Sequence, residues 1–536
     1  MSDVGTLIVG SGVAAAALAK RLLAIDPNAS ILMVEAGQRV KMQDAAIWQD
    51  YVVSNKLPYT KYYDRIYPER DVPGENINAG KTNVNLDGAR VFTYGGSTIH
   101  WGGWSFRLKP EDFELRKRTE RAIDWPFSYD KLEPYYGQAE HYLGVSGDSK
   151  DPTVPRSTQF PFAAFPYTLE DQPLALALDK LALSHSHLPI ARRGMSEQPS
   201  RHAPCQTTGT CKYCPFGARY SANNYLDEML QWGSYPYLAI QLGAIVHQIL
   251  MENRATAIGV ELLDSTDGKI KKITADRVVV AAGAIESAKL LKRSRSQHWP
   301  RGIGNDKDLV GRNIVTHPYF VFQGLQKSSN KYGLQPEMNF PTLVSRHFDS
   351  EAEQKEGKFV LLNPPGSPKI DIAKLMRQGK TRSEVDTIIS APAIVEIHGM
   401  VEVFSDPNNY IDNHPISNFI GIPQTVVDYT QDPGFELRMQ SIQGHVQKIF
   451  HEMDSELLGK PSISWRADHA ACTVRMSHNP DEGVTDSNLH VHGVDNLFVC
   501  SNGVFPNLGA VNPTLTLTAL AIRLGDYLGR EKGAVK

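Results

Sequence analysis

The sequence predicts a mixed α/β fold of two interwoven lobes, and three observations support this prediction. The first forty residues alternate strand, helix and strand around two glycines. Further apolar, strand-like runs follow hundreds of residues later, at residues 278–282 and 496–500. The chain has 536 residues, which is too long for one ordinary domain. We therefore expect a discontinuous Rossmann-like lobe that is interrupted by a second lobe.

The N-terminal strand–helix–strand unit accounts for the first observation. Residues 6–9 form a short apolar run suited to a buried parallel strand. The alanine-rich residues 13–24 favour a helix, and residues 30–35 form a second apolar strand that ends in an acid. This order is typical of a dinucleotide-binding unit.

Four residues of this unit predict nucleotide contacts. Gly10 permits the tight turn, and Gly12 lets the backbone approach a pyrophosphate at the helix N-terminus. Ala15 takes the third small position, where helix meets strand, and Glu35 is placed to accept hydrogen bonds from a ribose. A carboxylate there repels a 2′-phosphate, which argues against NADP. The pattern leaves FAD, NAD and a tight turn without a ligand open.

The later apolar runs extend the same lobe. Residues 241–250 and 257–275 predict strands joined by turns. The strand at 278–282 is followed by a helix, as in the N-terminal unit. The stretch 311–465 interrupts these elements, and it is the expected substrate lobe.

Composition and charge set the class of protein. The net charge is −3 without a basic run, which argues against nucleic-acid binding. We find no apolar stretch of about eighteen residues and predict no membrane span. The first residues do not match a signal peptide, so the cytoplasm is the default location; co-export to the periplasm with a signal-bearing partner would leave no trace here. Five cysteines do not suit a disulfide scaffold in so long a chain.

Several motifs along the chain share one resemblance. They are the fingerprint at Gly10, "YGGSTIHWGG", "DWPFSYDKLEPYY", "VVVAAGAIESAKLL", "LVGRNIVTHP", and "DHAACTVRM" with "GAVNPTLTLTALAIR". Together they resemble the glucose–methanol–choline (GMC) oxidoreductases, FAD enzymes that oxidise alcohols, and most closely the sugar-oxidising branch that includes pyranose 2-oxidase, FAD-dependent glucose dehydrogenase and glycoside 3-dehydrogenases. The resemblance implies an FAD-binding lobe in residues 1–310 and 466–536, and a sheet-roofed substrate lobe in residues 311–465.

The same resemblance implies a catalytic pair. Alcohol oxidation by a flavin needs a base for the hydroxyl proton, and an imidazole suits this task because its pKa lies near neutrality. His469 matches the family's base, and Asn512 matches the partner that holds the alcohol while a hydride passes to flavin N5. The sequence departs from the family pattern at Cys472 and Ser477, where glycine is usual or frequent. Without the motif, the alternative interpretation of His469 is a loop histidine with satisfied hydrogen bonds.

Flavin contacts are implied in two further segments. Gly95 and Gly96 form a flexible loop that lies against the flavin, and His100 aligns with a histidine that binds FAD covalently in pyranose 2-oxidase. We expect noncovalent FAD, because histidyl attachment is a trait of a single branch. The other contacts are expected in the C-terminal return of the chain, at Asn502, Gly503, Pro513 and Thr514.

Three cysteines are crowded into one short loop, at Cys205, Cys211 and Cys214. Zinc with His202 as fourth ligand is one interpretation, and three plain thiols or a disulfide with a spare thiol are another. The interpretation we favour is a [3Fe-4S] cluster, which three thiolates can hold. The catalytic subunit of FAD glucose dehydrogenase is similar in carrying such a loop, although the last spacing is one residue shorter here.

The expected function is oxidation of a secondary hydroxyl of a sugar or glycoside to a keto sugar, with position 3 preferred by resemblance and positions 1 and 2 open. Electrons would leave through the cluster to an external acceptor, with a small partner subunit, a cytochrome or a quinone as partner. The alternatives are a sugar oxidase that reduces O2 to H2O2 without a cluster, a flavoprotein lyase and a non-catalytic binding subunit. Candidate substrate contacts are Trp104, His398, Glu402 and Gln424.

Overall fold

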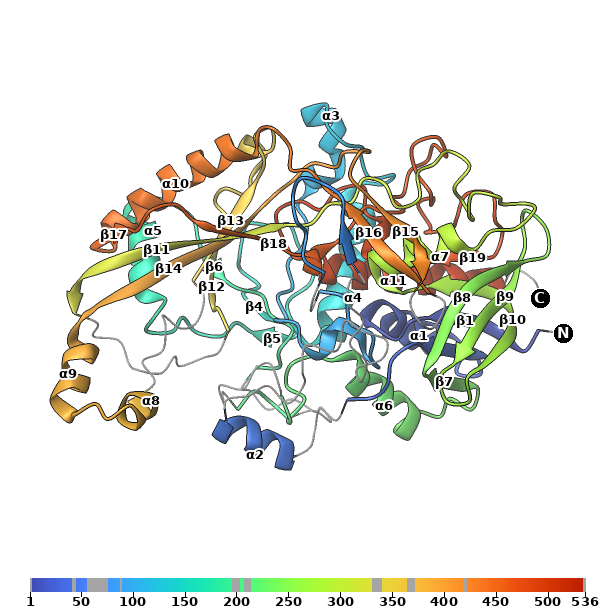
Figure 1. Ribbon diagram of the computed structural model, residues 1–536, viewed down its shortest axis with the longest axis horizontal. Helices are drawn as coiled ribbons and strands as arrows, with labels where there is room; N and C mark the ends of the chain where they lie inside the picture. The colour runs from blue at the N-terminus through green and yellow to red at the C-terminus, as the bar shows by residue number, and fades with distance from the viewer. Residues whose placement is uncertain are drawn as a thin grey trace.

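The computed structural model describes residues 2–40, 45–54, 76–86, 89–194, 203–206, 214–329, 340–363, 372–417 and 422–533. Two large β-sheets lie at opposite ends of an elongated molecule (Figure 1). One is mainly parallel and lies near both chain ends, and the other is antiparallel and lies at the far end. The predicted mixed α/β fold is confirmed.

The mainly parallel sheet is assembled from distant parts of the chain. Its five parallel strands are β7 (Leu238–Leu242), β2 (Ile31–Glu35), β1 (Val4–Val9), β10 (Lys269–Val280) and β19 (Leu497–Val499). The antiparallel strands β9 (Ala257–Asp264) and β8 (Ala244–Met251) continue it. The long strand β10 serves both parts, because its first half pairs with β9 and its second half pairs with β1 and β19.

Burial explains why these apolar runs form strands. The side chains of Leu7, Ile8 and Val279 are fully buried, as expected for parallel strands that are covered on both faces. Helices α1 (Val13–Ile25) and α11 (Thr514–Gly533) pack against each other beside the sheet. The C-terminal helix therefore belongs to the same lobe as the first forty residues (Figure 1).

The antiparallel sheet forms the other end of the molecule. Its strands are β17 (Ser455–Leu457), β11 (Pro318–Ser329), β14 (Pro392–Val401), β13 (Phe359–Leu362), β12 (Leu343–Ser345) and β6 (Ser186–His187), with β18 (Ser462–Trp465) also paired to β11. Helix α10 (Phe435–Glu452) covers one face through a shared apolar core. Phe320, Ile397 and Ile442 are buried in this core.

Two strand pairs cross the predicted lobe boundaries. Strand β6 joins the antiparallel sheet although it precedes residue 311. A smaller sheet pairs β3 (Asn76–Asn78) with β16 (Pro423–Asp428) and then β15 (Tyr410–Ser417). The division into residues 1–310, 311–465 and 466–536 remains a prediction.

The other helices and strands connect or flank these sheets. The helices are α2 (Ala45–Ser54), α3 (Leu115–Thr119), α4 (Tyr129–Leu143), α5 (Gln172–Lys180), α6 (Ala222–Trp232), α7 (Gly283–Arg293), α8 (Ile372–Arg377) and α9 (Arg382–Ser390). The short strands β4 (Ser146–Gly147) and β5 (Phe162–Ala163) pair with each other. No helix among the described residues combines the length and the apolar character that crossing a bilayer requires.

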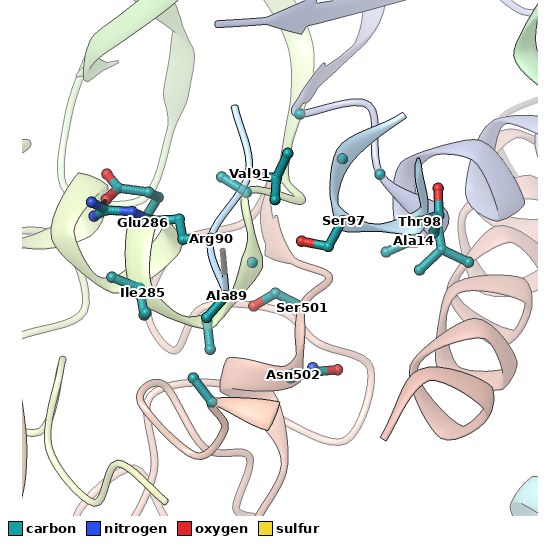
Figure 2. A pocket seen from close by; sticks show the side chains of 18 of the residues that line it. Ala14, Ala89, Arg90, Val91, Ser97, Thr98, Ile285, Glu286, Ser501 and Asn502 are labelled. Carbon is teal, nitrogen blue, oxygen red and sulfur yellow. Dashed lines mark hydrogen bonds and ion pairs between the residues drawn. The ribbon is translucent and has the colours of Figure 1, made fainter. Parts of the chain in front are cut away.

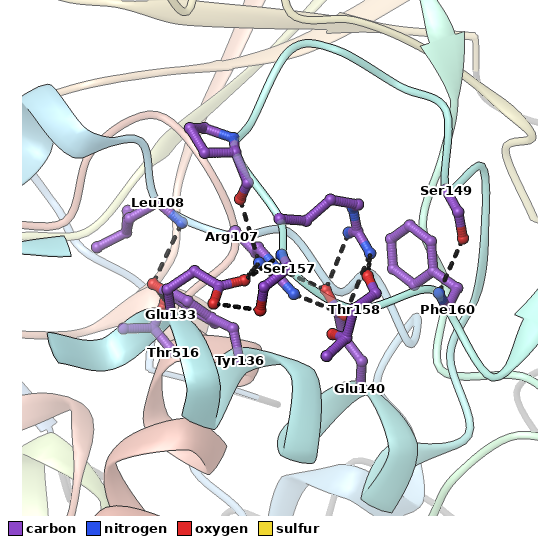
Figure 3. Close-up of polar contacts among 12 residues, drawn as sticks. Arg107, Leu108, Glu133, Tyr136, Glu140, Ser149, Ser157, Thr158, Phe160 and Thr516 are labelled. Atoms are coloured by element: carbon purple, nitrogen blue, oxygen red, sulfur yellow. Dashed lines mark hydrogen bonds and ion pairs between the residues drawn. The ribbon is translucent and has the colours of Figure 1, made fainter. Parts of the chain in front are cut away.

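Buried polar contacts fix helix α4 and the start of helix α11 (Figure 3). The guanidinium of Arg107 donates to Glu133 and to Glu140 at 2.8 Å each. The Tyr136 hydroxyl on α4 lies 2.8 Å from the Thr516 hydroxyl in the first turn of α11. These contacts hold the first turn of α11 in place, and with it the loop that leads into this helix.

Candidate active site

A cavity of about 780 Å³ lies between the two sheets. Its lining includes Val9 and Val34 at the carboxyl ends of two parallel strands, and Tyr319 and Met400 from the antiparallel sheet. The volume is in the usual range for small-molecule sites, about 300–1,000 Å³. The crevice at the carboxyl ends of parallel strands is also where open α/β sheets bind ligands.

The glycine loop after β1 leaves an open place at the N-terminus of α1. Gly10 has a φ of +105°, and a Cβ there would lie 2.6 Å from the carbonyl oxygen of Ala281, so only glycine fits. A Cβ on Gly12 would meet no heavy atom of the described structure within 4 Å. The helix end beside Gly12 is therefore accessible to an anionic group such as a pyrophosphate.

Glu35 connects this loop to a second glycine loop. Its carboxylate is buried and accepts hydrogen bonds from the Ser11 hydroxyl at 2.7 Å, the Ser11 amide at 3.1 Å and the Gly37 amide at 2.9 Å. The Ser11 hydroxyl in turn accepts from the Gly95 amide at 3.0 Å. Burial raises the pKa of Glu35 above its usual range. Glu35 lines the cavity at the end of β2, where dinucleotide-binding units place the acid that contacts a ribose.

Figure 2 shows further lining side chains near the parallel sheet, from the segments at residues 89–91, 97–98, 285–286 and 501–502. Arg90 Nη1 donates to Glu286 Oε1 on α7 at 2.6 Å, which fixes one wall. The buried Oδ1 of Asn502 has no hydrogen-bond partner among the described residues. An unsatisfied acceptor of this kind favours a polar ligand in the cavity.

Two histidines and an asparagine form a hydrogen-bonded row at the cavity wall. Asn512 Nδ2 lies 2.9 Å from His469 Nε2, and His469 Nδ1 lies 2.9 Å from His317 Nδ1. The other ring nitrogen of His317 lies 2.8 Å from the carbonyl oxygen of Gly509. The two imidazoles meet edge to face, with an interplanar angle of 84°.

Burial keeps both imidazoles neutral. It lowers the pKa of His469 to about 4. The pKa of His317 is lowered to about 3 by burial and by the neighbouring His469. A neutral His469 near pH 7 is able to accept a proton, which is what a general base requires.

Two sequence models of one family, both described as GMC oxidoreductase, match residues 189–319 and residues 408–521. The chain belongs to the GMC oxidoreductases. The fructose dehydrogenase large subunit of Gluconobacter japonicus is 27% identical to it, over 97% of each chain. The 6'''-hydroxyparomomycin C oxidase of Streptomyces lividus is 25% identical, over 98% of this chain and 92% of the relative. The crystal structure of pyridoxine 4-oxidase from Mesorbium loti has the same fold, with a TM-score of 0.67 at 18% identity over 98% of this chain and 99% of the other.

FAD is the cofactor that the GMC family implies, and the residues at the parallel-sheet end fit it. The open helix end at Gly12 suits a pyrophosphate, and Glu35 has the position of the acid that contacts a ribose in dinucleotide-binding units. The unpartnered Oδ1 of Asn502 is available to a donor of the bound cofactor. These residues would hold the cofactor in this GMC oxidoreductase.

The structure brings most of the predicted site residues of this GMC oxidoreductase to one cavity. Its lining contains Gly10, Gly12, Glu35, Gly96, His100, His469, Asn502, Asn512 and Thr514. Four other predicted cofactor contacts do not belong to the lining that the described residues form, but each is adjacent in sequence to a residue that does: Ala15, Gly95, Gly503 and Pro513. Ala15 is fully buried in α1, which agrees with the packing position predicted for it. The roles assigned to all these residues remain predictions.

The predicted substrate contacts divide into two groups. Trp104 belongs to the cavity lining, whereas His398, Glu402 and Gln424 do not belong to the lining that the described residues form. Glu402 is buried elsewhere, where it accepts a hydrogen bond from the backbone amide of Lys358 at 3.2 Å. Burial raises the pKa of Glu402 to about 8.

Sequence reasoning missed two lining residues, His317 and Tyr319. His317 lies inside the "LVGRNIVTHP" motif, and Tyr319 directly follows it near the start of β11. The histidine inside that motif was the available signal. It was not usable alone, because the contact that gives His317 a role is with a residue 152 positions away.

The cysteine loop is only partly described. Cys205 is buried, Cys214 is half-buried, and neither forms a disulfide, whereas Cys211 and His202 lie outside the described residues. Arg192 Nη1 donates to Cys205 Sγ at 3.7 Å. No group of three or more His, Cys, Asp or Glu side chains in the described ranges is arranged to hold a metal. The structure therefore does not support the predicted cluster, which remains a proposal.

Cys472 explains one departure from the family pattern. Its backbone has a φ of +69°, in the left-handed region that favours glycine, and its side chain is fully buried. The loop beside His469 thus keeps the glycine-type conformation that the family pattern expects, with a cysteine in that position. Burial raises the pKa of this thiol to about 12, so it is not a nucleophile.

Proposed function

We propose that this GMC oxidoreductase oxidises a secondary hydroxyl of a sugar or glycoside to a keto sugar, with FAD as the electron acceptor. The observation that carries the proposal is the neutral His469, whose Nε2 faces Asn512 at the wall of a cavity that fits a dinucleotide. The relatives support a sugar substrate, since one is by its name a fructose dehydrogenase. Position 3 of a glycoside is the preferred site of oxidation.

The two side chains divide the work on the hydroxyl. On binding, the substrate hydroxyl would replace Asn512 Nδ2 as the donor to His469 Nε2, and its oxygen would accept a hydrogen bond from the same Asn512 amide, so that the alcohol is held beside its base. The proton of the hydroxyl passes to His469 as the carbonyl forms. When bound, FAD supplies the two-electron acceptor that takes the carbon-bound hydrogen as a hydride.

A hydrogen-bonded pair of Glu396 and His398 orients the Tyr319 hydroxyl to bind another substrate hydroxyl. His398 Nε2 lies 2.9 Å from Glu396 Oε2, and a carboxylate only accepts, so Nε2 carries the proton. Burial lowers the pKa of His398, so Nδ1 of the neutral ring accepts the hydroxyl hydrogen of Tyr319 at 2.7 Å. The oxygen of Tyr319, which lines the cavity, is thereby left as an acceptor. A substrate with several hydroxyls suits this arrangement better than a simple apolar alcohol.

Tyr319→Phe is expected to raise KM for the sugar substrate about 10-fold, because one hydrogen bond of about 1.4 kcal/mol is lost. kcat should change little, since His469 and Asn512 are untouched. The matched control is Tyr237→Phe, at a side chain that is 60% exposed. Unchanged KM in both variants would contradict a substrate contact at Tyr319.

Anaerobic titration of the FAD-loaded protein tests the proposed function. A sugar or glycoside substrate should bleach the visible absorbance of the flavin, and a glycoside deuterated at carbon 3 should bleach it more slowly than one deuterated at carbon 2. Faster bleaching by a sugar with a free position 1 than by its glycoside would move the site of oxidation. If no sugar or glycoside bleaches bound FAD, the chain is instead a lyase or a binding subunit.

The cysteine loop supports an external acceptor as the exit for electrons. With iron at Cys205, Cys211 and Cys214, a one-electron centre would supply single-electron transfer to a cytochrome or quinone, through a small partner subunit. The alternative is reduction of O2 to H2O2 without a cluster, and an oxidase among the relatives supports it. About three irons per chain with little peroxide in air favour the first route, and iron near zero with stoichiometric peroxide favours the second.

The acid limb of the pH profile should report His469. Its pKa is lowered from 6.5 to about 4, so the neutral, active form persists until the pH falls through about 4. kcat/KM is therefore expected to stay level between pH 7 and pH 5 and to fall tenfold per pH unit below about 4. Intrinsic fluorescence at each pH provides the control for folding. A fall that begins near pH 6.5 in folded protein contradicts this environment for His469.

A further inference from the structure

We propose that His317 is a positioning residue that fixes the tautomer of neutral His469, so that Nε2 is the unprotonated nitrogen when the substrate binds. The inference rests on the proposed function, in which His469 is the base. His317 touches neither Asn512 nor a substrate hydroxyl in this scheme, so it would act only through His469.

The direction of the hydrogen bonds follows from one backbone carbonyl. The Gly509 carbonyl oxygen only accepts, so His317 Nε2, at 2.8 Å, must carry a hydrogen. In a neutral His317, Nδ1 is then an acceptor, and the hydrogen between the two Nδ1 atoms belongs to His469. His469 Nε2 is consequently bare, and Asn512 Nδ2 donates to it at 2.9 Å. The amide orientation of Asn512 is consistent with this direction, because Nδ2 can only donate.

The carbonyl that sets this direction belongs to a position that requires glycine. Gly509 has a φ of +60°, and a Cβ at this position would lie 2.9 Å from Leu108 Cδ2 and 3.3 Å from Asp112 Cγ. Asn512 belongs to the same short loop before α11. One loop therefore contacts both ends of the histidine row, with a carbonyl at one end and an amide at the other.

The backbone around His317 is tied to the segment that carries His469. Val315 and Ala471 exchange backbone hydrogen bonds in an isolated bridge, at 3.2 and 3.0 Å. The Thr316 hydroxyl donates to the carbonyl oxygen of Arg466 at 2.5 Å. His317 is 4% exposed, and its lowered pKa keeps the ring neutral near pH 7. Its Nδ1 therefore remains an acceptor. If His317 were charged, both of its ring nitrogens would carry hydrogens, and its Nδ1–H would face the Nδ1–H of His469.

The matched substitutions are His317→Leu and His317→Asn, which have nearly the same shape. Asn restores an acceptor oxygen near His469 Nδ1, whereas Leu offers none. We expect Leu to lower kcat about 100-fold with KM nearly unchanged, since a wrong tautomer costs a serine protease about 10⁴-fold. Loss of a remote positioning partner typically costs about 10- to 100-fold. Because Asn keeps an acceptor for His469 Nδ1, it should recover kcat to within about 10-fold of the parent.

A double-mutant cycle separates positioning from a structural role. In a His469→Ala background, His317→Leu should lower the residual kcat by less than about 3-fold, because its effect depends on His469. FAD content and melting temperature are measured for every variant, and His317→Gln with His317→Met replaces the pair if Leu does not bind FAD. Equal losses with Leu and Asn, or a full additional loss in the His469→Ala background, would overturn the inference. Full turnover by His469→Ala alone would instead overturn the proposed base.

Discussion

Replacing His469 with alanine should lower kcat for the sugar substrate about 10³-fold, which is typical for the loss of a general base. The imidazole lies at the cavity wall with its Nε2 2.9 Å from Asn512 Nδ2, which is where the substrate hydroxyl would bind. The glycine loop at Gly10 and the carboxylate of Glu35 are untouched, so FAD content should stay near one per chain. Single-turnover bleaching by saturating sugar measures the chemical step directly.

The matched control for this prediction is His478→Ala, at an exposed histidine in the loop that follows. It should keep turnover within about twofold, since exposed substitutions rarely disturb a fold. If His469→Ala bleaches as fast as the parent protein, another group takes the proton. If it loses FAD, the cavity wall has changed, and turnover must be compared per bound flavin.

Lys358→Met is expected to remove about 3–5 kcal/mol from the free energy of unfolding. The ammonium of Lys358 is completely buried and forms ion pairs with Asp112 and with Asp349, the latter at 3.0 Å. Arg346 also pairs with Asp349, so removal of the lysine leaves Asp112 with the larger loss. The pKa of Lys358 is raised far above its usual range, because these carboxylates outweigh its burial. Two buried carboxylates without their shared cation would destabilise the folded state.

Thermal unfolding measures this effect, with Lys272→Met as the control. Lys272 is 66% exposed and lies 3.9 Å from Glu261, so its loss should cost less than about 0.5 kcal/mol. We expect the melting temperature of Lys358→Met to fall by about 3–4 °C, and that of the control to stay within about 1 °C. Equal melting temperatures would mean that the cluster is stable without its lysine.

Local patterns were sufficient to predict the parallel sheet from the sequence. The elements at residues 4–35 are contiguous, and each has the periodicity and glycine placement that its backbone needs. The predicted helix at 13–24 corresponds to α1 (Val13–Ile25), and the predicted strand at 30–35 to β2 (Ile31–Glu35). Family motifs then identified His469 and Asn512 as a pair, and the structure brings these side chains to 2.9 Å.

Contacts between distant segments were not predictable in this way. Glu402 stands in an alternating strand-like segment that suits a substrate lobe, yet its side chain enters a buried ion cluster. His317 lies inside the "LVGRNIVTHP" motif, but the motif does not indicate which side chain His317 contacts. That contact follows only from the register between the start of β11 and the loop at His469.

The strand order of the parallel sheet has a consequence for biosynthesis. Strand β10 pairs with β1 from the start of the chain and with β19 at residues 497–499. A nascent chain therefore exposes one edge of β10 until residues 497–499 have left the ribosome. Since Asn502 lies three residues after the end of β19, we expect flavin to be captured only once this segment has emerged and completed the sheet.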